Sequence, residues 1–177
     1  WDILNLIQGT RQGPNRGGSK PLLKVYNARS DCSLRVFSLT ETRKLALIVH
    51  SGTLDKLLCA FILASTAATM DFEVHMYFTF WGLMMLKKGE MERAGLPATY
   101  KHMEKQMRDR LREMNYPTPY EMLRRLKNSG RLTLYACTPS MEMFGITKKD
   151  LIPEVDTLAG AATFLDVAAD ADTTLLI

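Results

Sequence analysis

The segment Leu45-Ala-Leu-Ile-Val49 is followed by the turn residues His50-Ser-Gly-Thr53 and then by an Ala- and Leu-rich stretch from Leu54. A short continuous apolar run is typical of a central strand in a parallel sheet, because both faces of such a strand are covered. The glycine permits a tight turn, and the threonine after it can cap a helix. The sequence therefore predicts a strand, a turn and a helix that ends near Thr69. Because this helix is almost uncharged after Lys56, we expect it to be buried on most sides.

The alternation of strands and helices continues to the end of the chain. A run at 72–80 is rich in β-branched and aromatic residues, and a third run at 131–137 leads directly into Thr138-Pro139, a helix start signal. This order predicts an α/β fold with a mainly parallel five-stranded sheet and helices on both faces. The remaining strands are expected at 154–158 and 173–177, and the remaining helices at 141–144 and 161–170.

A long helical insertion is predicted between the second and third strands, at residues 83–130, and seven of the 11 Met residues lie in it. We favour a core or subunit-contact role for these side chains, because Met is adaptable packing material. A membrane-surface or partner groove, supported by the basic character of the insertion, is the alternative. Apolar side chains spaced three and four residues apart form one helical stripe, namely Tyr100, Met103, Met107, Leu111 and Met114.

Length and composition predict one globular domain preceded by an arm. The 177 residues, 46% of them hydrophobic, suffice to bury a core. Residues 1–43, with several Gly and Pro in their first half, are predicted to be an N-terminal arm or linker, and residues 44–177 the domain. The longest uncharged stretches, 57–70 and 74–86, have 14 and 13 residues, whereas a spanning helix needs roughly 20. No transmembrane helix is therefore predicted, although peripheral membrane contact is a weaker possibility.

Charge and cysteine content exclude several classes of protein. The net charge of 23 − 19 = +4 is too mild to indicate nucleic-acid binding. Residues 87–131 carry 12 − 6 = +6 and residues 132–177 carry 2 − 7 = −5, which fits either solvated helix faces, the favoured interpretation, or opposed faces used between subunits. The three cysteines, Cys32, Cys59 and Cys137, form neither a disulfide framework nor a four-ligand zinc site, so we expect a reducing, cytoplasmic compartment.

Polar and reactive side chains follow three of the predicted strands. Ligands of open parallel sheets bind at the carboxyl ends of the strands, so these residues are candidates for one pocket. If the first and third strands are neighbours, His50 and Cys137 share a rim. The candidates are His50, Ser51 and Thr53 after the first strand, Thr79 and Trp81 after the second, and Cys137, Thr138 and Ser140 around the end of the third.

Cys137 is the candidate catalytic residue. It ends a predicted strand just before a helix N-terminus, where unpaired N–H groups and the helix dipole favour an anion. A thiol in that position can have its pKa lowered, and the same N–H groups could stabilise a persulfide or a thiosulfonate. The alternative is a small buried hydrophobe, which position alone slightly favours. Cys59 lies in an apolar helix and is expected to pack in the core, whereas Cys32 has no partner near it in sequence.

Motifs for other chemistry are absent from the sequence. The stretch Ser51-Gly-Thr-Leu-Asp-Lys56 lacks the glycine spacing and the ending of a phosphate-binding P-loop. No G-x-G-x-x-G follows the first strand, no G-x-S-x-G elbow occurs, and no metal-ligand spacing is present. We therefore expect neither a cofactor nor a metal.

Three stretches resemble the DsrE/DsrF-like family, and in particular its larger subgroup often labelled peroxiredoxin-related. They are Leu47-Ile-Val-His-Ser-Gly-Thr-Leu-Asp-Lys56, Tyr77-Phe-Thr-Phe-Trp-Gly-Leu83 and Leu134-Tyr-Ala-Cys-Thr-Pro-Ser-Met141 with the following Gly145-Ile146. The resemblance covers about residues 44–177. It implies a flavodoxin-like three-layer sandwich that assembles as an oligomer and passes sulfane sulfur between partner proteins through one cysteine, which maps to Cys137.

Two functions follow as hypotheses. The first is a sulfur carrier or sulfurtransferase that takes sulfur from a donor protein onto Cys137 and yields it to an acceptor, as a homo-oligomer. The second is a non-catalytic binding or assembly module that uses the Met-rich basic insertion. A small-molecule or nucleotide site at the same rim is a weaker third possibility.

Overall fold

The computed structural model describes residues 42–177, so the predicted N-terminal arm, with Cys32 but apart from its last two residues, lies outside the described residues. The elements follow in the order β1 (Lys44–Val49), α1 (Leu54–Thr69), β2 (Glu73–Phe78), α2 (Phe80–Met84), η2 (Met91–Arg93), η3 (Ala98–Met103), α3 (Glu104–Glu113), α4 (Pro119–Asn128), β3 (Leu132–Cys137), α5 (Thr138–Phe144), η4 (Lys148–Asp150), β4 (Thr157–Ala159), α6 (Ala161–Ala169) and β5 (Thr173–Leu176). The described part is thus an α/β fold, as predicted.

The five strands form one parallel sheet in the order β4-β3-β2-β1-β5. The first and third strands are not neighbours, because β2 lies between them, so the condition under which His50 and Cys137 would share a rim is not met. In the register, Tyr77 of β2 stands opposite both Ile48 of β1 and Tyr135 of β3. All strands end at the same edge, since all are parallel, and this edge carries the candidate residues.

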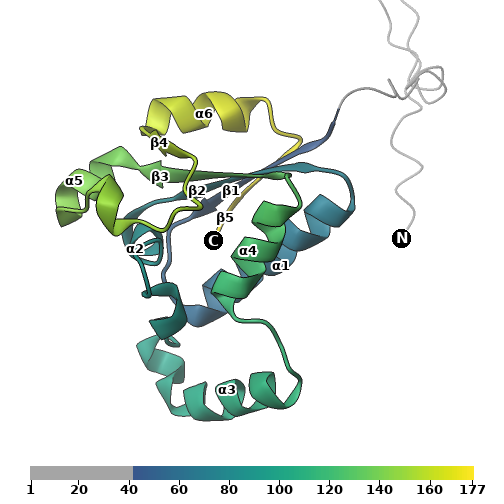
Figure 1. Cartoon of the computed structure of the whole chain (residues 1–177), viewed down its shortest axis with the longest axis vertical. Helices are drawn as coiled ribbons and strands as arrows, with labels where there is room; N and C mark the ends of the chain where they lie inside the picture. The colour runs from purple at the N-terminus through teal and green to yellow at the C-terminus, as the bar shows by residue number, and fades with distance from the viewer. Residues whose placement is uncertain (1–41) are drawn as a thin grey trace, which may run out of the picture. The chain divides into compact units, whose positions relative to one another are not determined.

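Helices cover both faces of the sheet, which confirms the predicted layers. Helices α1 and α4 lie on one face and α6 lies on the other (Figure 1). Alternate strand residues point to the two faces. The larger cluster, on the side of α1 and α4, includes Leu47, Met76 and Leu134. The smaller cluster, on the side of α6, contains Ala46, Tyr77, Tyr135, Cys137, Ala159 and Phe164.

Helix α1 is less buried than predicted. Its side towards the sheet is packed, but Cys59 is exposed and Ile62 is 45% exposed. The expectation that Cys59 packs in the core is therefore wrong, because α1 packs mainly against α4 and the sheet and its apolar composition extends beyond the covered side.

Strand β4 is shorter and begins later than the predicted strand at 154–158. The carboxylate of Asp156 accepts the N–H of Leu134 at 2.7 Å and forms an ion pair with Lys127. The Asp156 carboxylate thus accepts a backbone N–H that a carbonyl of the neighbouring strand would accept in a regular sheet. Regular pairing between β3 and β4 starts only at Thr157.

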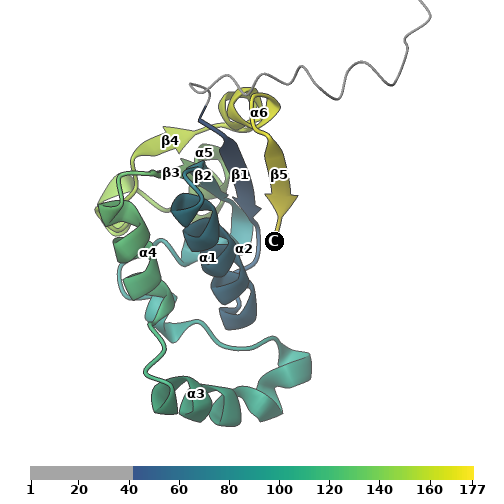
Figure 2. The same cartoon turned by 90° about the vertical axis from the view of Figure 1, so that its right-hand side faces the viewer.

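The predicted insertion contains an arm that stands away from the sheet. This arm consists of η3 and α3 and is distinct from the predicted N-terminal arm. Both views place α3 below α1 and α4 (Figures 1 and 2). None of the ten residues of α3 is buried, although Met107 and Leu111 pack partly against the core. Helix α4 begins with a full capping box between Thr118 and Glu121 and covers the sheet. No helix among residues 42–177 is long and apolar enough to cross a membrane.

Candidate functional site

Cys137 lies at the carboxyl edge of the sheet, where β3 passes directly into α5. It is the last residue of β3 and the N-cap of α5, with a proline in the first turn of that helix. Its side chain points to the face covered by α6 and is only 5% exposed. The thiol is thus placed in a small, mostly apolar enclosure.

A chain of hydroxyl groups ends at the Cys137 sulfur. Ser140 Oγ donates to Cys137 Sγ at 3.2 Å, and it also accepts the backbone N–H of Phe80 at 3.0 Å. Thr79 Oγ1 lies 3.1 Å from Ser140 Oγ. Because Ser140 has a single proton, which is given to the sulfur, Thr79 must be the donor to Ser140. Both hydroxyls are buried, so the chain directs donors at the sulfur in a region of low dielectric constant.

These donors favour the thiolate form of Cys137. Burial raises the pKa of the thiol, but the hydrogen bond from Ser140 and the nearby hydroxyls of Thr79 and Tyr77 lower it, and the net result is a pKa below that of an ordinary cysteine. Thiolate is the nucleophilic form of cysteine, so the lowered pKa increases the share of nucleophilic sulfur at a given pH.

The residues after β2 adopt a constrained turn beside this sulfur. Phe80 has a φ of +46°, a left-handed conformation that costs a bulky residue energy. Its N–H bond to Ser140 holds that conformation in place. Two residues later, a Cβ on Gly82 would lie 2.2 Å from the carbonyl oxygen of Val49, so only glycine fits. The turn is therefore fixed tightly against the end of β1.

The structure brings only some of the predicted site residues together. Thr79, Ser140 and Cys137 are joined by hydrogen bonds, and Thr138 begins α5. His50 is exposed, and its ring lies 5.2 Å from that of Phe80, which follows β2, the strand between β1 and β3.

The other two predicted residues of the first turn bond to each other rather than to the thiol. The hydroxyls of Ser51 and Thr53 are 3.2 Å apart. Trp81 is 59% exposed and lies 5.3 Å from the ring of Phe144, so α2 and α5 meet at the surface of this edge.

Sequence reasoning missed Tyr77 and Phe80. Tyr77 is 6% exposed, faces the Cys137 side, and its hydroxyl has no hydrogen-bond partner among the described residues. Burial and the neighbouring Cys137 raise its pKa. The two-residue alternation from Tyr77 to Thr79 could have placed both hydroxyls on one face. No local signal could have revealed the strained Phe80.

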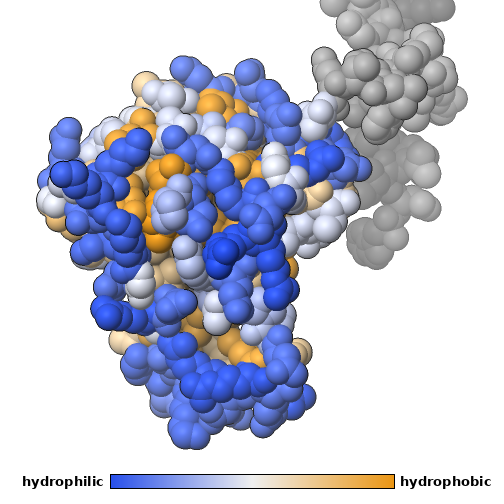
Figure 3. Space-filling model, viewed as in Figure 1, coloured by the Kyte–Doolittle hydropathy of each residue, from blue (hydrophilic) through white to orange (hydrophobic). Residues whose placement is uncertain are grey.

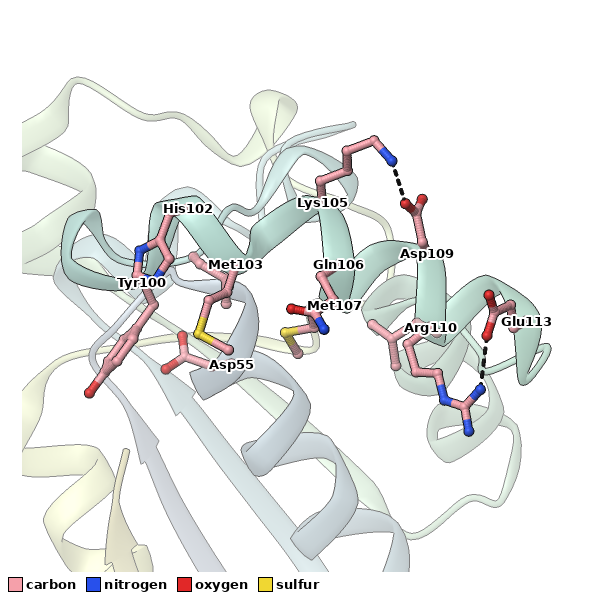
Figure 4. Close-up of a pocket in the computed structure, with 12 residues that line it drawn as sticks. Asp55, Tyr100, His102, Met103, Lys105, Gln106, Met107, Asp109, Arg110 and Glu113 are labelled. Atoms are coloured by element: carbon pink, nitrogen blue, oxygen red, sulfur yellow. Dashed lines mark hydrogen bonds and ion pairs between the residues drawn. The ribbon is translucent and has the colours of Figure 1, made fainter.

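A second feature is a groove of about 1080 Å³ between the arm and the start of α1. Met103 and Met107 point from the arm towards α1, where Asp55 lies (Figure 4). Charged side chains of the arm form ion pairs with one another, as Lys105 does with Asp109. The side of the arm towards α1 is mostly apolar. Apolar surface is visible where the η3–α3 arm meets the rest of the described chain (Figure 3).

Metal binding has no support in the described part of the chain. No group of three or more His, Cys, Asp or Glu side chains within residues 42–177 is placed to hold a metal ion. The chemistry available at the sheet edge is that of the thiol and its hydroxyl donors.

This fold and this strand-end cysteine occur in a sequence that matches a known family. The chain belongs to the DsrE/DsrF/DrsH-like family, whose model matches residues 41–122 and 99–176. The sulfur carrier protein DsrE2 of Allochromatium vinosum is 32% identical over 160 residues, which is 77% of this chain and 99% of that protein. The uncharacterized protein YrkE of Bacillus subtilis is 26% identical over 159 residues, with 77% and 98% covered. The predicted family is confirmed.

Solved structures share the fold. The ychN protein of E. coli superposes with a TM-score of 0.52 at 12% identity, over 77% of this chain and 100% of that one. The protein MTH1491 of Methanobacterium thermoautotrophicum gives 0.52 at 9% identity, over 76% and 99%. At these identities the likeness concerns the fold alone.

Proposed function

We propose that this protein is a sulfur carrier that holds sulfane sulfur on Cys137, as a persulfide or a thiosulfonate, and passes it to a partner protein. The observation that carries the proposal is the buried chain of donors from Thr79 through Ser140 to the Cys137 sulfur. Membership of the family and the similarity to a protein named as a sulfur carrier support it.

The transfer is a nucleophilic exchange at sulfur. The Cys137 thiolate attacks the outer sulfur of the donor and forms a new S–S bond, and the donor's own bond to that sulfur breaks, so that its leaving group departs with the electron pair. A thiolate on the acceptor protein then attacks the carried sulfur in the same way and releases Cys137. No electron acceptor is needed, because each S–S bond formed replaces one that is broken.

The remaining rim residues shape the approach to this thiol. In this proposal Trp81 lines the outer surface of the edge, and His50, Ser51, Thr53 and Thr138 lie along the approach at the ends of β1 and β3. Donor and acceptor proteins are the partners of this function, and the carrier works as a homo-oligomer without a cofactor.

Mass spectrometry of the intact protein tests the proposal. The chain is incubated with thiosulfate, tetrathionate or polysulfide, and peptide mapping locates any sulfur added. We expect a reducible adduct on Cys137 that is lost in Cys137→Ser. The matched control is Cys59→Ser, which removes an exposed thiol and should leave the Cys137 adduct intact. Sulfur that persists in Cys137→Ser would contradict the proposal.

The groove beside the arm favours a second candidate function, a binding or assembly module. Two of its apolar side chains, Met103 and Tyr100, are about half exposed, and exposed apolar surface is a usual mark of an interaction site. Replacing Met103 and Met107 by Lys separates the two functions. A binding module loses its assembly in this variant, as measured by sedimentation, whereas a sulfur carrier retains its adduct on Cys137.

A further inference from the structure

We propose that Tyr77 is the hydrogen-bond donor to the terminal sulfur of a persulfide on Cys137, and that the site therefore carries a single sulfane sulfur rather than a thiosulfonate. This inference rests on the proposed function and specifies its cargo.

The position of Tyr77 is fixed by the sheet and by α6. Tyr77 stands opposite Tyr135 in the register, and Cys137 follows two residues later on the same face of β3. The ring of Tyr77 stacks on that of Phe164 with centroids 4.6 Å apart and planes within 14°. Phe164 is itself fully buried, so this stack restricts where the Tyr77 hydroxyl can point.

The Tyr77 hydroxyl is a buried donor that makes no hydrogen bond within the described part of the chain. The residue is 6% exposed, and its oxygen has no hydrogen-bond partner within residues 42–177. It nevertheless lies close enough to Cys137 for each group to shift the pKa of the other. Buried polar groups are normally paired, and an unpaired one in a folded protein calls for an explanation. A ligand atom attached to Cys137 provides it.

The donors around the sulfur have separate tasks in this arrangement. Ser140 already gives its proton to Cys137 Sγ. A persulfide adds one sulfur at about 2 Å from Sγ, and this atom carries the negative charge. The Tyr77 hydroxyl is the donor left to receive it, and a hydrogen bond to a charged acceptor is among the stronger ones.

A thiosulfonate fits the same enclosure poorly. Its sulfonate group brings three oxygens, each of which needs a donor when buried. The side chains that pack beside Cys137 on this face include Ala159 and Phe164, which have none to offer. Even with the Ser140 N–H, which also lies beside the sulfur, and with Tyr77 as the added donor, a single sulfur anion is satisfied and the three oxygens of a sulfonate are not.

The exchange that fills the site balances without an oxidant. The Cys137 thiolate attacks the outer sulfur of a donor persulfide R–S–SH and forms the new S–S bond. The donor's S–S bond breaks, and the departing R–S⁻ takes up the proton from that outer sulfur. The products are the Cys137 persulfide anion and R–SH.

Tyr77→Phe tests the role of the hydroxyl, because it keeps the ring that stacks on Phe164. Loading of Cys137 at equilibrium with a low-molecular-weight persulfide is measured by mass spectrometry, and we expect about a tenfold to hundredfold lower exchange constant in the variant. The matched control is Tyr135→Phe, whose hydroxyl lies 3.1 Å from His75 Nδ1, and it should load as the wild type does. Because the hydroxyl lost from Tyr77 has no partner, the thermal stability of Tyr77→Phe should equal or exceed that of the wild type.

The outcomes separate this inference from the proposed function. Equal loading of Tyr77→Phe and wild type, with none in Cys137→Ser, would refute the role of Tyr77 and leave the carrier function standing. Tetrathionate that converts Cys137 to a thiosulfonate as completely as polysulfide forms the persulfide would refute the choice of cargo. A wild-type protein that takes no sulfur on Cys137 from any donor would overturn both.

Discussion

Ser140→Ala is the change that most directly probes the activation of Cys137. Ser140 is buried, donates to the Cys137 sulfur at 3.2 Å and accepts the N–H of Phe80 at 3.0 Å. Its removal takes away the donor nearest to the thiolate and also interrupts the chain from Thr79. The pKa of Cys137 should therefore rise.

The size of the effect follows from the energy of one hydrogen bond to a charged group, about 1.5–3 kcal/mol. Since about 1.4 kcal/mol is a factor of ten, the thiolate fraction near neutral pH should fall by about one to two orders of magnitude. A less acidic thiol is a stronger nucleophile, with a Brønsted coefficient of about 0.4–0.5, so the rate of alkylation should fall by only about 4- to 15-fold. At high pH, where both thiols are ionised, the variant should react about 3- to 10-fold faster for the same reason.

The assay is the pH profile of alkylation by a small haloacetamide, measured in a background of Cys32→Ser and Cys59→Ser so that only Cys137 reacts. Ser129→Ala is the control, because it removes a hydroxyl from the end of α4, where Ser129 bonds to Leu126. A Ser140→Ala profile that differs from the wild type by one constant factor at every pH would refute the reasoning, since it would indicate altered access rather than altered acidity.

Three further predictions concern packing and the arm. Phe164→Ala removes a fully buried ring that stacks on Tyr77 and should lower the free energy of unfolding by about 3–5 kcal/mol in chemical denaturation. Gly82→Ala places a Cβ 2.2 Å from the Val49 carbonyl and should lower the melting temperature, with a cost of roughly 1–3 kcal/mol or more. Hydrogen bonds from Lys101, the Leu96 N–H and Arg108 hold the pKa of Glu104 at about 2. The stabilisation that these bonds give to the η3–α3 arm is therefore fully present above pH 4.5 and is lost as the pH falls towards 2. The rate of amide hydrogen exchange in residues 96–113, corrected for its intrinsic pH dependence, should increase as the pH falls through that interval. The same rate should stay constant in Glu104→Gln.

The parts of the fold that depend on residues close together in the sequence were predictable. The strand at β1, the turn after it and the extent of α1 follow from a local apolar run and a capping signal, and the structure confirms all three. Strand order is set by pairing between distant segments, which no local pattern encodes. The placement of β2 between β1 and β3 therefore came only from the structure.

The burial of α1 shows a different limit of the sequence. Apolar composition tells how much surface a helix could bury, but not how many neighbours cover it. Cys59 is exposed for this reason, in a helix whose other side is packed. Cys137 was singled out correctly as a strand-end thiol, whereas Tyr77 was not singled out, because an aromatic residue in a strand is usually part of the core.

Burial of the Cys137 sulfur has a consequence for how a partner protein reaches it. In the proposed transfer a thiolate on another protein must approach the carried sulfur directly, and Cys137 is only 5% exposed. Exchange therefore requires local opening of the sheet edge formed by α2 and α5, which have five and seven residues. Short elements with few buried contacts open at lower cost than the core of a domain. The Phe80 N–H bond to Ser140 links that opening to the donors on the sulfur, because a movement of α2 that breaks this bond also disturbs the group that stabilises the thiolate.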